Sequence, residues 1–375
     1  MKSIYLDYNA TTPIDPAVGD AMLPFIHKHF GNPSSGHEYG LATKKAIDQA
    51  RQQVADMAGC LPEEIIFTSG GSEANNFAIK GTAHVLHHKG NHIITSAVEH
   101  PAVTEVCRYL ENHGFEITYL TVDEFGLVDV RQVEEAITPQ TILITIMHAN
   151  NEVGTIEPIV EISELARRNN IQMHSDCAQS VGKIPVTVDK LGVDMLSIAG
   201  HKLYAPKGIG ALYVRTGIEL EKQMHGADHE MNRRAGTENV LEIVGLGKAC
   251  EMVKQNLASY HDYMQKTRDR LEFALKEKLP SIKINGHPVM RLPNTASISF
   301  PGLEANKILA ELSEVAASAG AACHSDQINV SSVLEAMLVP LDYAMGTVRF
   351  STGRHTTIEE IDRAVQAILR VVEKM

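Results

Sequence analysis

The fold of this chain is decided by one central stretch, Ser197-Ile198-Ala199-Gly200-His201-Lys202-Leu203-Tyr204-Ala205-Pro206-Lys207-Gly208. It includes the end of a short apolar run, 193–198, which has the length of a buried strand. Lys202 therefore stands just past a strand end, where open α/β folds place their ligands. A partly desolvated lysine with other cations nearby has a lowered pKa and can form a Schiff base. The competing interpretation is a solvated loop lysine, because most lysines are surface residues.

Strands and helices alternate through most of the chain. The patterns predict strands at 64–68, 91–96, 115–122, 141–147, 171–174, 194–198 and 210–214. Helical patterns cover 40–58, 77–88, 101–112 and 158–169. This alternation is typical of an α/β fold with a mainly parallel, mixed sheet between layers of helices.

The length of 375 residues exceeds what one hydrophobic core usually holds, so we expect two domains. A largely helical stretch at 240–279 is followed by strands at 281–285 and 295–300 and helices at 304–314 and 357–374. We therefore expect an N-terminal arm at 1–14 that joins the small domain, a large domain at 15–258 and a small α+β domain at 259–375.

Composition narrows the partners and the compartment. The net charge of −12 argues against nucleic acid or an anionic membrane recognised by bulk charge. The sequence has no apolar run long enough to span a bilayer and no signal-peptide core at its start. Its five cysteines lack metal-ligand spacing and a disulfide framework, which predicts free thiols and a cytoplasmic protein.

A glycine-rich turn follows the predicted strand 64–68 and reads Ser69-Gly70-Gly71-Ser72-Glu73-Ala74-Asn75-Asn76. Free N–H groups at the start of the following helix, a hydroxyl at Ser72 and a close approach at Gly71 together suit a phosphate. A serine that caps the helix without any ligand is the alternative. The turn lacks the Lys-Ser/Thr pair of a Walker loop and is no dinucleotide fingerprint.

Other polar segments also follow predicted strands, at 98–101, 148–154 and 174–180. Parallel-sheet geometry would gather them with Lys202 in one crevice. Its phosphate cradle, acid, imidazole, amide and lysine suit pyridoxal 5′-phosphate, with Asp176 keeping the pyridine nitrogen protonated. Taken singly, Asp176 is more often a helix cap and His100 a surface or packed histidine.

Seven pieces of the chain together resemble the cysteine desulfurases, in the class V aminotransferase branch of the pyridoxal-phosphate fold-type I enzymes. They are Tyr5-Leu6-Asp7-Tyr8-Asn9-Ala10-Thr11-Thr12-Pro13, the turn 68–76, Glu99-His100, Asn150-Asn151-Glu152, the segment 176–183, Gly200-His201-Lys202 and Arg234-Ala235-Gly236-Thr237. The similarity continues through Arg349-Phe350-Ser351-Thr352-Gly353-Arg354, so it covers almost the whole chain.

The resemblance implies a fold-type I enzyme and a role for each matching residue. Lys202 would bond covalently to the cofactor, Asp176 would pair with its ring nitrogen, and His100 would stack on the ring and move protons. The other implied contacts are Asn151 and Gln179 to the ring oxygen, Gly71, Ser72 and His201 to the phosphate, Thr237 of a partner subunit to the same phosphate, and Arg349 with Asn151 to the substrate. A homodimer with shared active sites follows from the position of Thr237.

The resemblance also assigns a nucleophile, Cys323, in Ser318-Ala319-Gly320-Ala321-Ala322-Cys323-His324-Ser325-Asp326. Small residues predict a mobile loop here. The Cys323 thiolate would take the sulfur of L-cysteine as a persulfide and release L-alanine, and an acceptor protein would then receive the sulfur, as in iron–sulfur cluster assembly. On the residues alone, a small cysteine packed among alanines is the alternative. The packing interpretation is kept for Cys60, Cys107, Cys177 and Cys250.

Departures from the family pattern leave alternatives open. Ala199 replaces a serine that often binds the phosphate, and the segment 226–230 lacks the usual glycine run. The sequence around Cys323 is also similar to selenocysteine lyases, so cysteine and selenocysteine both stay open as substrates. An aminotransferase of another small amino acid and a catalytically silent scaffold are further alternatives, and the sequence does not identify the sulfur acceptor.

Histidine pairs with a spacing of four residues occur at His84/His88 and His225/His229. Such spacing is compatible with a metal, but no carboxylate motif accompanies either pair. We therefore expect no metal site.

Overall fold

The alternating strands form one seven-stranded sheet in the computed structural model, which describes residues 3–324 and 327–375 and leaves out the side chains of 321–329. The strand order is β2 (Ile65–Thr68), β8 (Gly210–Val214), β7 (Met195–Ala199), β6 (Gln172–Asp176), β5 (Thr141–Thr145), β3 (His92–Ser96) and β4 (Glu116–Leu120). Only β8 runs opposite to its neighbours, pairing antiparallel with β2 and β7. The prediction of a mainly parallel, mixed sheet is confirmed.

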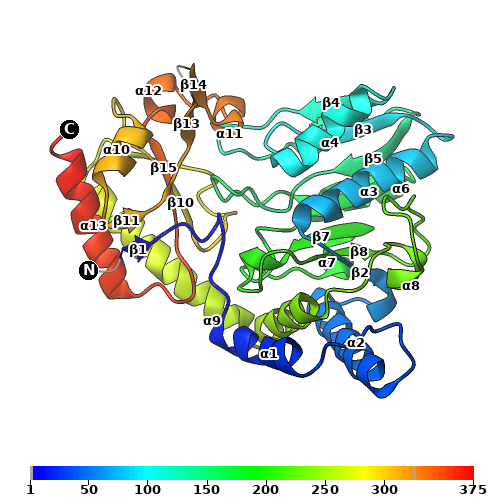
Figure 1. Ribbon diagram of the computed structural model, residues 1–375. Coiled ribbons are helices and arrows are strands. Elements are labelled where there is room, and N and C mark those ends of the chain that lie inside the picture. The colour runs from blue at the N-terminus through cyan, green and yellow to red at the C-terminus, as the bar shows by residue number, and fades with distance from the viewer. Residues whose placement is uncertain (1–2, 325–326) are drawn as a thin grey trace.

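Helices cover both faces of this sheet (Figure 1). One face packs against α3 (Gly71–Leu86) and α4 (Pro101–Glu111), the other against α2 (Glu38–Ala58), α6 (Ile159–Arg168) and the first half of α9 (Val240–Lys278). Successive strand residues alternate between the two cores: Ile93 belongs to one and Ile94 to the other. Both faces of each strand are therefore apolar, which explains the near-continuous apolar runs in the sequence.

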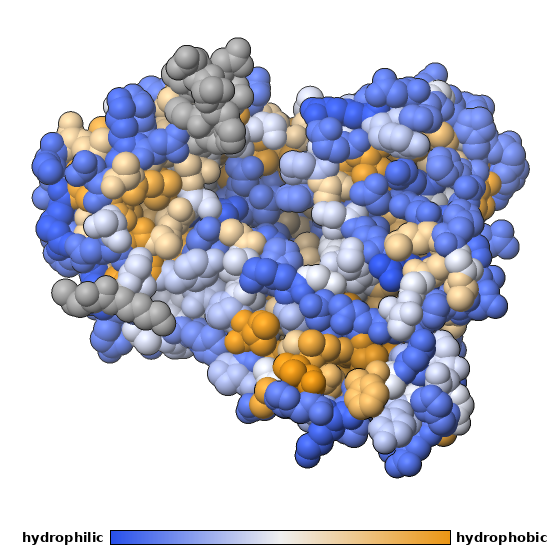
Figure 2. All heavy atoms as spheres, viewed as in Figure 1, coloured by the Kyte–Doolittle hydropathy of each residue, from blue (hydrophilic) through white to orange (hydrophobic). Residues whose placement is uncertain are grey.

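Four further helices of the described chain belong to this half of the molecule. They are α1 (Pro16–His27), α5 (Val130–Ala136), α7 (Val188–Leu191) and α8 (His229–Asn232). Leu23, Ile26 and Phe30, on and just after α1, are exposed, and Figure 2 shows apolar surface over α1 at the bottom of the view. Among the described residues, no helix combines the length and the apolar character that a membrane crossing needs.

A second, four-stranded antiparallel sheet forms the other half. Its order is β12 (Ser318–Ala319), β15 (Thr347–Ser351), β10 (Thr295–Ser299) and β9 (Lys283–Asn285). The end of α9, together with α10 (Ala305–Glu311) and α13 (Ile358–Val372), packs on it around a separate core. The N-terminal segment joins this core, because β1 (Ile4–Tyr5) pairs with β11 (Val315–Ala316). The expected domain boundaries at 14/15 and 258/259 are consistent with two cores and stay a prediction.

The segment expected to be a mobile loop has a regular backbone where it is described. β13 (Ala321–His324) pairs antiparallel with β14 (Gln327–Val330), and α11 (Ser332–Ala336) and α12 (Leu341–Ala344) follow. A small apolar cluster joins α11 to the larger half, through Val333 and Leu334 against Val98 and Val153. The hairpin that carries Cys323 is thus attached next to the carboxyl edge of the large sheet.

Candidate active site

The carboxyl ends of the parallel strands open into one cavity of about 290 Å³. It is lined by the larger half of the molecule and by Ala10 of the N-terminal arm, and Figure 2 shows the surface hollowed between the two halves. Its lining residues are Ala10, Gly71, Ser72, Asn75, His100, Ala102, Met147, Ala149, Asn151, Asp176, Ala178, Gln179, Ala199, His201 and Lys202. The structure therefore brings eight of the predicted site residues to one wall: Gly71, Ser72, His100, Asn151, Asp176, Gln179, His201 and Lys202.

Lys202 ends a short 3₁₀ turn, Gly200–Lys202, directly after β7. Its Nζ donates to the backbone carbonyl oxygens of Asn9 and Ala10, the latter at 2.9 Å. Burial and the positive charge of Arg349 together lower the pKa of Lys202 to about 8, although Asp176 and Asp7 oppose the shift. A substantial fraction of the amine is therefore neutral near physiological pH, which makes it a nucleophile.

Asp176 closes β6 and is 7% exposed. One carboxylate oxygen accepts the N–H of Ala178 at 2.8 Å, and the other accepts Nδ2 of Asn75 at 2.6 Å. These two donors fix the plane of the carboxylate. The alternative of a helix cap fails, because a turn and not a helix follows Asp176.

His100 is the N-cap of α4, and its Nδ1 accepts the N–H of Ala102 at 3.1 Å. In the neutral ring the hydrogen must then be on Nε2. Burial lowers the pKa of His100, with Asp176 opposing the shift and Lys202 adding to it. The imidazole therefore faces the cavity as a neutral ring with one donor.

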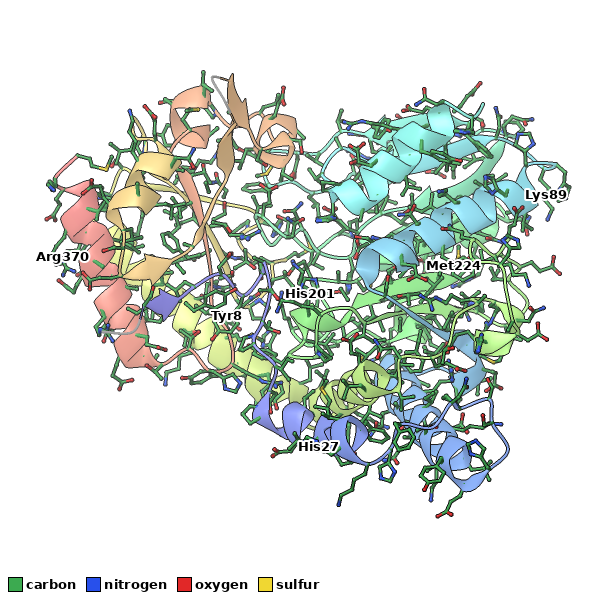
Figure 3. All side chains as sticks on the ribbon, viewed as in Figure 1. Tyr8, His27, Lys89, His201, Met224 and Arg370 are labelled. Carbon is green, nitrogen blue, oxygen red and sulfur yellow. The ribbon has the colours of Figure 1, made fainter. Side chains whose placement is uncertain are left out.

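The glycine-rich turn lies where the sequence predicts an anion site. α3 begins at Gly71, so the N–H groups of its first turn lack helical acceptors. A Cβ at Gly71 would approach the Cβ of Ala199 to 3.2 Å, so glycine keeps this corner open. His201 lies across from it, near the centre of Figure 3, and its Nδ1 is 3.2 Å from Oγ1 of Thr11. Burial lowers the pKa of His201 to about 4, and nearby Lys202 contributes to the same shift.

Arg349 lies on β15, behind the cavity wall. Its Nη1 donates to the carbonyl oxygen of Asn151 at 3.0 Å, and its Nη2 donates to Asp7 at 2.9 Å and to Ser318 at 3.1 Å. In the described part of the chain, its Nε has no hydrogen-bond partner. Asn151 is thus the link between Arg349 and the cavity.

Two predicted site residues are not assembled with the others. Thr237 is exposed and lines a neighbouring cavity with Arg234 and Glu238, and Ser69 and Gly208 connect that cavity to the pocket at Gly71 and Ser72. The side chain of Cys323 lies outside the described residues, and only its backbone is placed, in β13.

The other cysteines are not nucleophile candidates. Cys107, Cys177 and Cys250 are buried, which confirms their packing interpretation. Burial raises the pKa of each of these three thiols, and of half-buried Cys60, to about 12. Across the described residues, no three His, Cys, Asp or Glu side chains are grouped as a metal site would require.

Sequence reasoning missed one residue in the arm, Asn9. Its carbonyl oxygen accepts from Lys202 and Gln179, and its side chain bonds to Asn151 and Lys183. The motif in which it occurs was part of the resemblance, but no pattern within nine residues tells which distant groups the arm will meet. Asn75 was also missed, although its place one turn into α3 after a phosphate motif is a usable signal.

Comparison with known proteins agrees with this geometry. The family described as aminotransferase class-V matches residues 4–364. The chain is 47% identical to a protein named cysteine desulfurase IscS from Dictyoglomus turgidum, covering 100% of this chain and 95% of that protein. A protein of the same name from Methanosarcina thermophila is 46% identical, with coverage of 100% and 93%.

Solved structures are similar over the same extent. A NifS-like protein superimposes with a TM-score of 0.94 at 34% identity, covering all of both chains. The structure of SspA in complex with cysteine superimposes with a TM-score of 0.82 at 39% identity, over 95% of this chain and 100% of that one.

Proposed function

This chain belongs to the class-V aminotransferase family and within it to the cysteine desulfurases, and from that premise we propose how its residues remove sulfur from L-cysteine. The observation that carries the proposal is a single cavity lined by Lys202, whose pKa is lowered to about 8, the anchored carboxylate of Asp176 and the imidazole of His100. The three groups suit amine chemistry on an aldehyde cofactor.

The donor set of the cavity fits pyridoxal 5′-phosphate. Asp176 would hold its ring nitrogen, Lys202 its aldehyde carbon and His100 its ring face. Gln179 and Asn151 would hold the ring oxygen, while Ser72, His201 and the N–H groups at Gly71 would hold the phosphate. When bound, the cofactor supplies an electron-withdrawing ring that stabilises negative charge on the substrate carbon.

Protons would move through Lys202 and His100. The neutral amine of Lys202 can accept a proton from the substrate, since a base works best with a pKa near the operating pH. Because Nδ1 of His100 is occupied by the N–H of Ala102, the proton that His100 gives or takes must be on Nε2. The substrate carboxylate would bind Arg349, whose planar guanidinium is oriented by Asp7 and Ser318.

The sulfur of the substrate would be transferred to Cys323. Its thiolate attacks the sulfur of bound L-cysteine, so that a sulfur–sulfur bond forms and the carbon–sulfur bond breaks. The electron pair of the broken bond goes to carbon, which is protonated to give L-alanine, and Cys323 keeps the persulfide. An acceptor protein would then take the outer sulfur, as iron–sulfur cluster assembly requires.

A homodimer would complete the site. Thr237 is exposed and separate from its own chain's Lys202 cavity, so a partner subunit could bring its Thr237 to the phosphate side through the connected cavity. The exposed apolar side chains at Leu23, Ile26 and Phe30 suit burial against a second copy. The buried or half-buried free thiols fit a cytoplasmic enzyme.

The test has two parts. Borohydride reduction of the purified protein, followed by peptide mass spectrometry, should place the cofactor on Lys202. Incubation with L-cysteine should then add one sulfur to the Cys323 peptide, with release of alanine. Label on a lysine other than Lys202, or on none, would overturn the assignment.

Variants separate the alternatives. Cys323→Ala should keep the cofactor but stop alanine release from L-cysteine, whereas the matched variant Cys60→Ala should retain it. If Cys323→Ala still releases alanine from L-selenocysteine at the wild-type rate, the chain also works as a selenocysteine lyase. Formation of a keto acid in place of alanine would instead indicate an aminotransferase.

A further inference from the structure

A buried lysine next to the cavity has no role in the reaction described above. Lys183 is 4% exposed, and no carboxylate pairs with it among the described residues. Its Nζ donates to Oε1 of Gln179 at 2.6 Å and to Oδ1 of Asn9 at 3.1 Å. Burying a lysine without an acid is costly, so these two contacts call for an explanation.

The first consequence concerns the orientation of the Gln179 amide. The backbone carbonyl oxygen of Asn9 can only accept, and the amine of Lys183 has N–H donors whether it is charged or neutral. Oε1 of Gln179 must therefore face Lys183, and its Nε2 must face the carbonyl oxygen of Asn9, which it contacts at 2.9 Å. The chemistry of the two neighbours dictates this orientation, which an amide alone would leave ambiguous.

The second consequence is a hydrogen-bond donor that Gln179 presents to the cavity. Gln179 is 5% exposed and lines the cavity with Lys202. Its Nε2 has two hydrogens, and only one bonds to Asn9. Within the described part of the chain no protein acceptor takes the second hydrogen, so an N–H donor is available to a ligand in the cavity.

We propose that Lys183 is a positioning residue: with the carbonyl oxygen of Asn9, it locks the Gln179 amide so that an N–H, and not an oxygen, faces the phenolic oxygen of the cofactor. This inference rests on the proposed function. A donor at that place stabilises the negatively charged phenolate, whereas an amide oxygen would repel it.

The charge around Lys183 explains why lysine suits this role. Burial lowers the pKa of Lys183 well below its usual value, and the positive charges of Lys202 and Arg349 lower it further. A neutral amine still has two N–H donors, one for Gln179 and one for Asn9. Lys183 can therefore orient the amide without adding a third positive charge beside Lys202, which an arginine could not do.

The experiment uses Lys183→Met, Gln179→Ala and the double variant. The readouts are the dissociation constant of pyridoxal phosphate and the pH midpoint of the bound cofactor's absorbance. Each single variant should raise the dissociation constant about tenfold, as the loss of one hydrogen bond to a charged group predicts. Each should also move the midpoint upward, because the phenolate loses a donor. Lys183→Met should add no further change in the Gln179→Ala background.

A second variant and a matched control keep the test independent of folding. Gln179→Glu keeps the size of the side chain and its acceptor for Lys183 but turns an oxygen toward the cavity. It should therefore weaken cofactor binding more than Gln179→Ala does. Lys190→Met, at an exposed lysine on α7, should change neither readout.

The outcomes separate the two proposals. Wild-type protein that binds no pyridoxal phosphate would overturn the proposed function itself. Normal binding with an unchanged dissociation constant and midpoint in Lys183→Met would overturn only the role of Lys183. So would additive effects in the double variant, because Lys183 would then act by another route.

Discussion

The two walls of the cavity are built in different ways. The strand-end wall carries His100, Asp176 and Lys202, each placed at the carboxyl end of a strand of the large sheet or within four residues after it. The docked wall consists of the N-terminal arm, whose Ala10 lines the cavity, and it is backed by the second sheet, where Asp7 of the arm meets Arg349 across 342 positions of the chain. The first wall follows from sheet topology, and the second exists only when the two halves of the molecule are held together.

The two walls also act on each other through charge. Arg349 of the docked wall lowers the pKa of Lys202 in the strand-end wall, while Asp7 raises it. Backbone carbonyl oxygens of the arm, at Asn9 and Ala10, accept the hydrogens of the same amine. The difference teaches that topology places the reactive groups and that docking adjusts their reactivity.

The largest expected effect, a loss of stability, comes from removing an ion pair that holds the two halves of the molecule together. Arg354 follows β15, bonds to Asp15 at the start of α1 and stacks on Tyr204 with its guanidinium carbon 3.8 Å from the ring centroid. The two charged side chains are 5% and 8% exposed. Arg354→Ala leaves the Asp15 carboxylate buried without its main partner, so the free energy of unfolding should fall by about 3 kcal/mol in chemical denaturation.

A surface pair provides the control for this prediction. Arg370 and Glu314 join separate elements within the second half, and their side chains are 60% and 49% exposed. Arg370→Ala should lower stability by no more than about 1 kcal/mol. Equal losses in the two variants would mean that the Arg354 contact does not hold the docked wall in place.

A smaller effect is expected when the docked wall stays in place and only the guanidinium of Arg349 is replaced. Arg349→Lys keeps the positive charge but cannot make the planar, bidentate contact with a carboxylate. The KM for L-cysteine should rise about 30-fold, which corresponds to about 2 kcal/mol of binding, with a smaller change in kcat. Steady-state kinetics on cofactor-saturated protein would measure this, and an unchanged KM would remove Arg349 from substrate binding.

The contrast between the walls also explains which site residues could be predicted from the sequence and which could not. His100, Asp176 and Lys202 were predictable because apolar strands are visible in the sequence and their carboxyl ends must meet. Asn9 and Lys183 were not, because a nine-residue arm and a buried lysine show no periodicity that names their distant partners. The hairpin at β13 and β14 was predicted as a loop, since small residues favour neither state and pairing decides the outcome.

The third prediction uses pH to sharpen the comparison. Because the pKa of Lys202 is about 8, incorporation of pyridoxal phosphate into cofactor-free protein should accelerate as the pH rises through that value, where the amine becomes neutral. Arg349→Gln removes a positive charge that lowers this pKa, so the midpoint should move upward. Asp7→Asn removes a negative charge that raises it, so the midpoint should move downward.

The two substitutions, Arg349→Gln and Asp7→Asn, should shift the pH midpoint in opposite directions, which distinguishes an effect of charge from an effect of structure. Stopped-flow absorbance against pH would give both midpoints, with Lys190→Met as a variant that should leave the midpoint in place. Shifts in the same direction would indicate that the two substitutions act by loosening the docked wall and not by their charge.

The smallest expected effect lies within the strand-end wall. Ala199 is 3% exposed at the end of β7 and lines the cavity with Gly71 and Ser72, on the side assigned to the phosphate. Ala199→Ser adds one hydroxyl donor there and should tighten pyridoxal phosphate binding a few-fold, since one hydrogen bond contributes about 1 kcal/mol. Ser72→Ala should weaken binding by a similar factor, measured by equilibrium titration. If Ala199→Ser weakens pyridoxal phosphate binding while the free energy of unfolding is unchanged, the added hydroxyl crowds Gly71. The shape of the site at Gly71 and Ser72 would then matter more for binding than its hydrogen-bond donors.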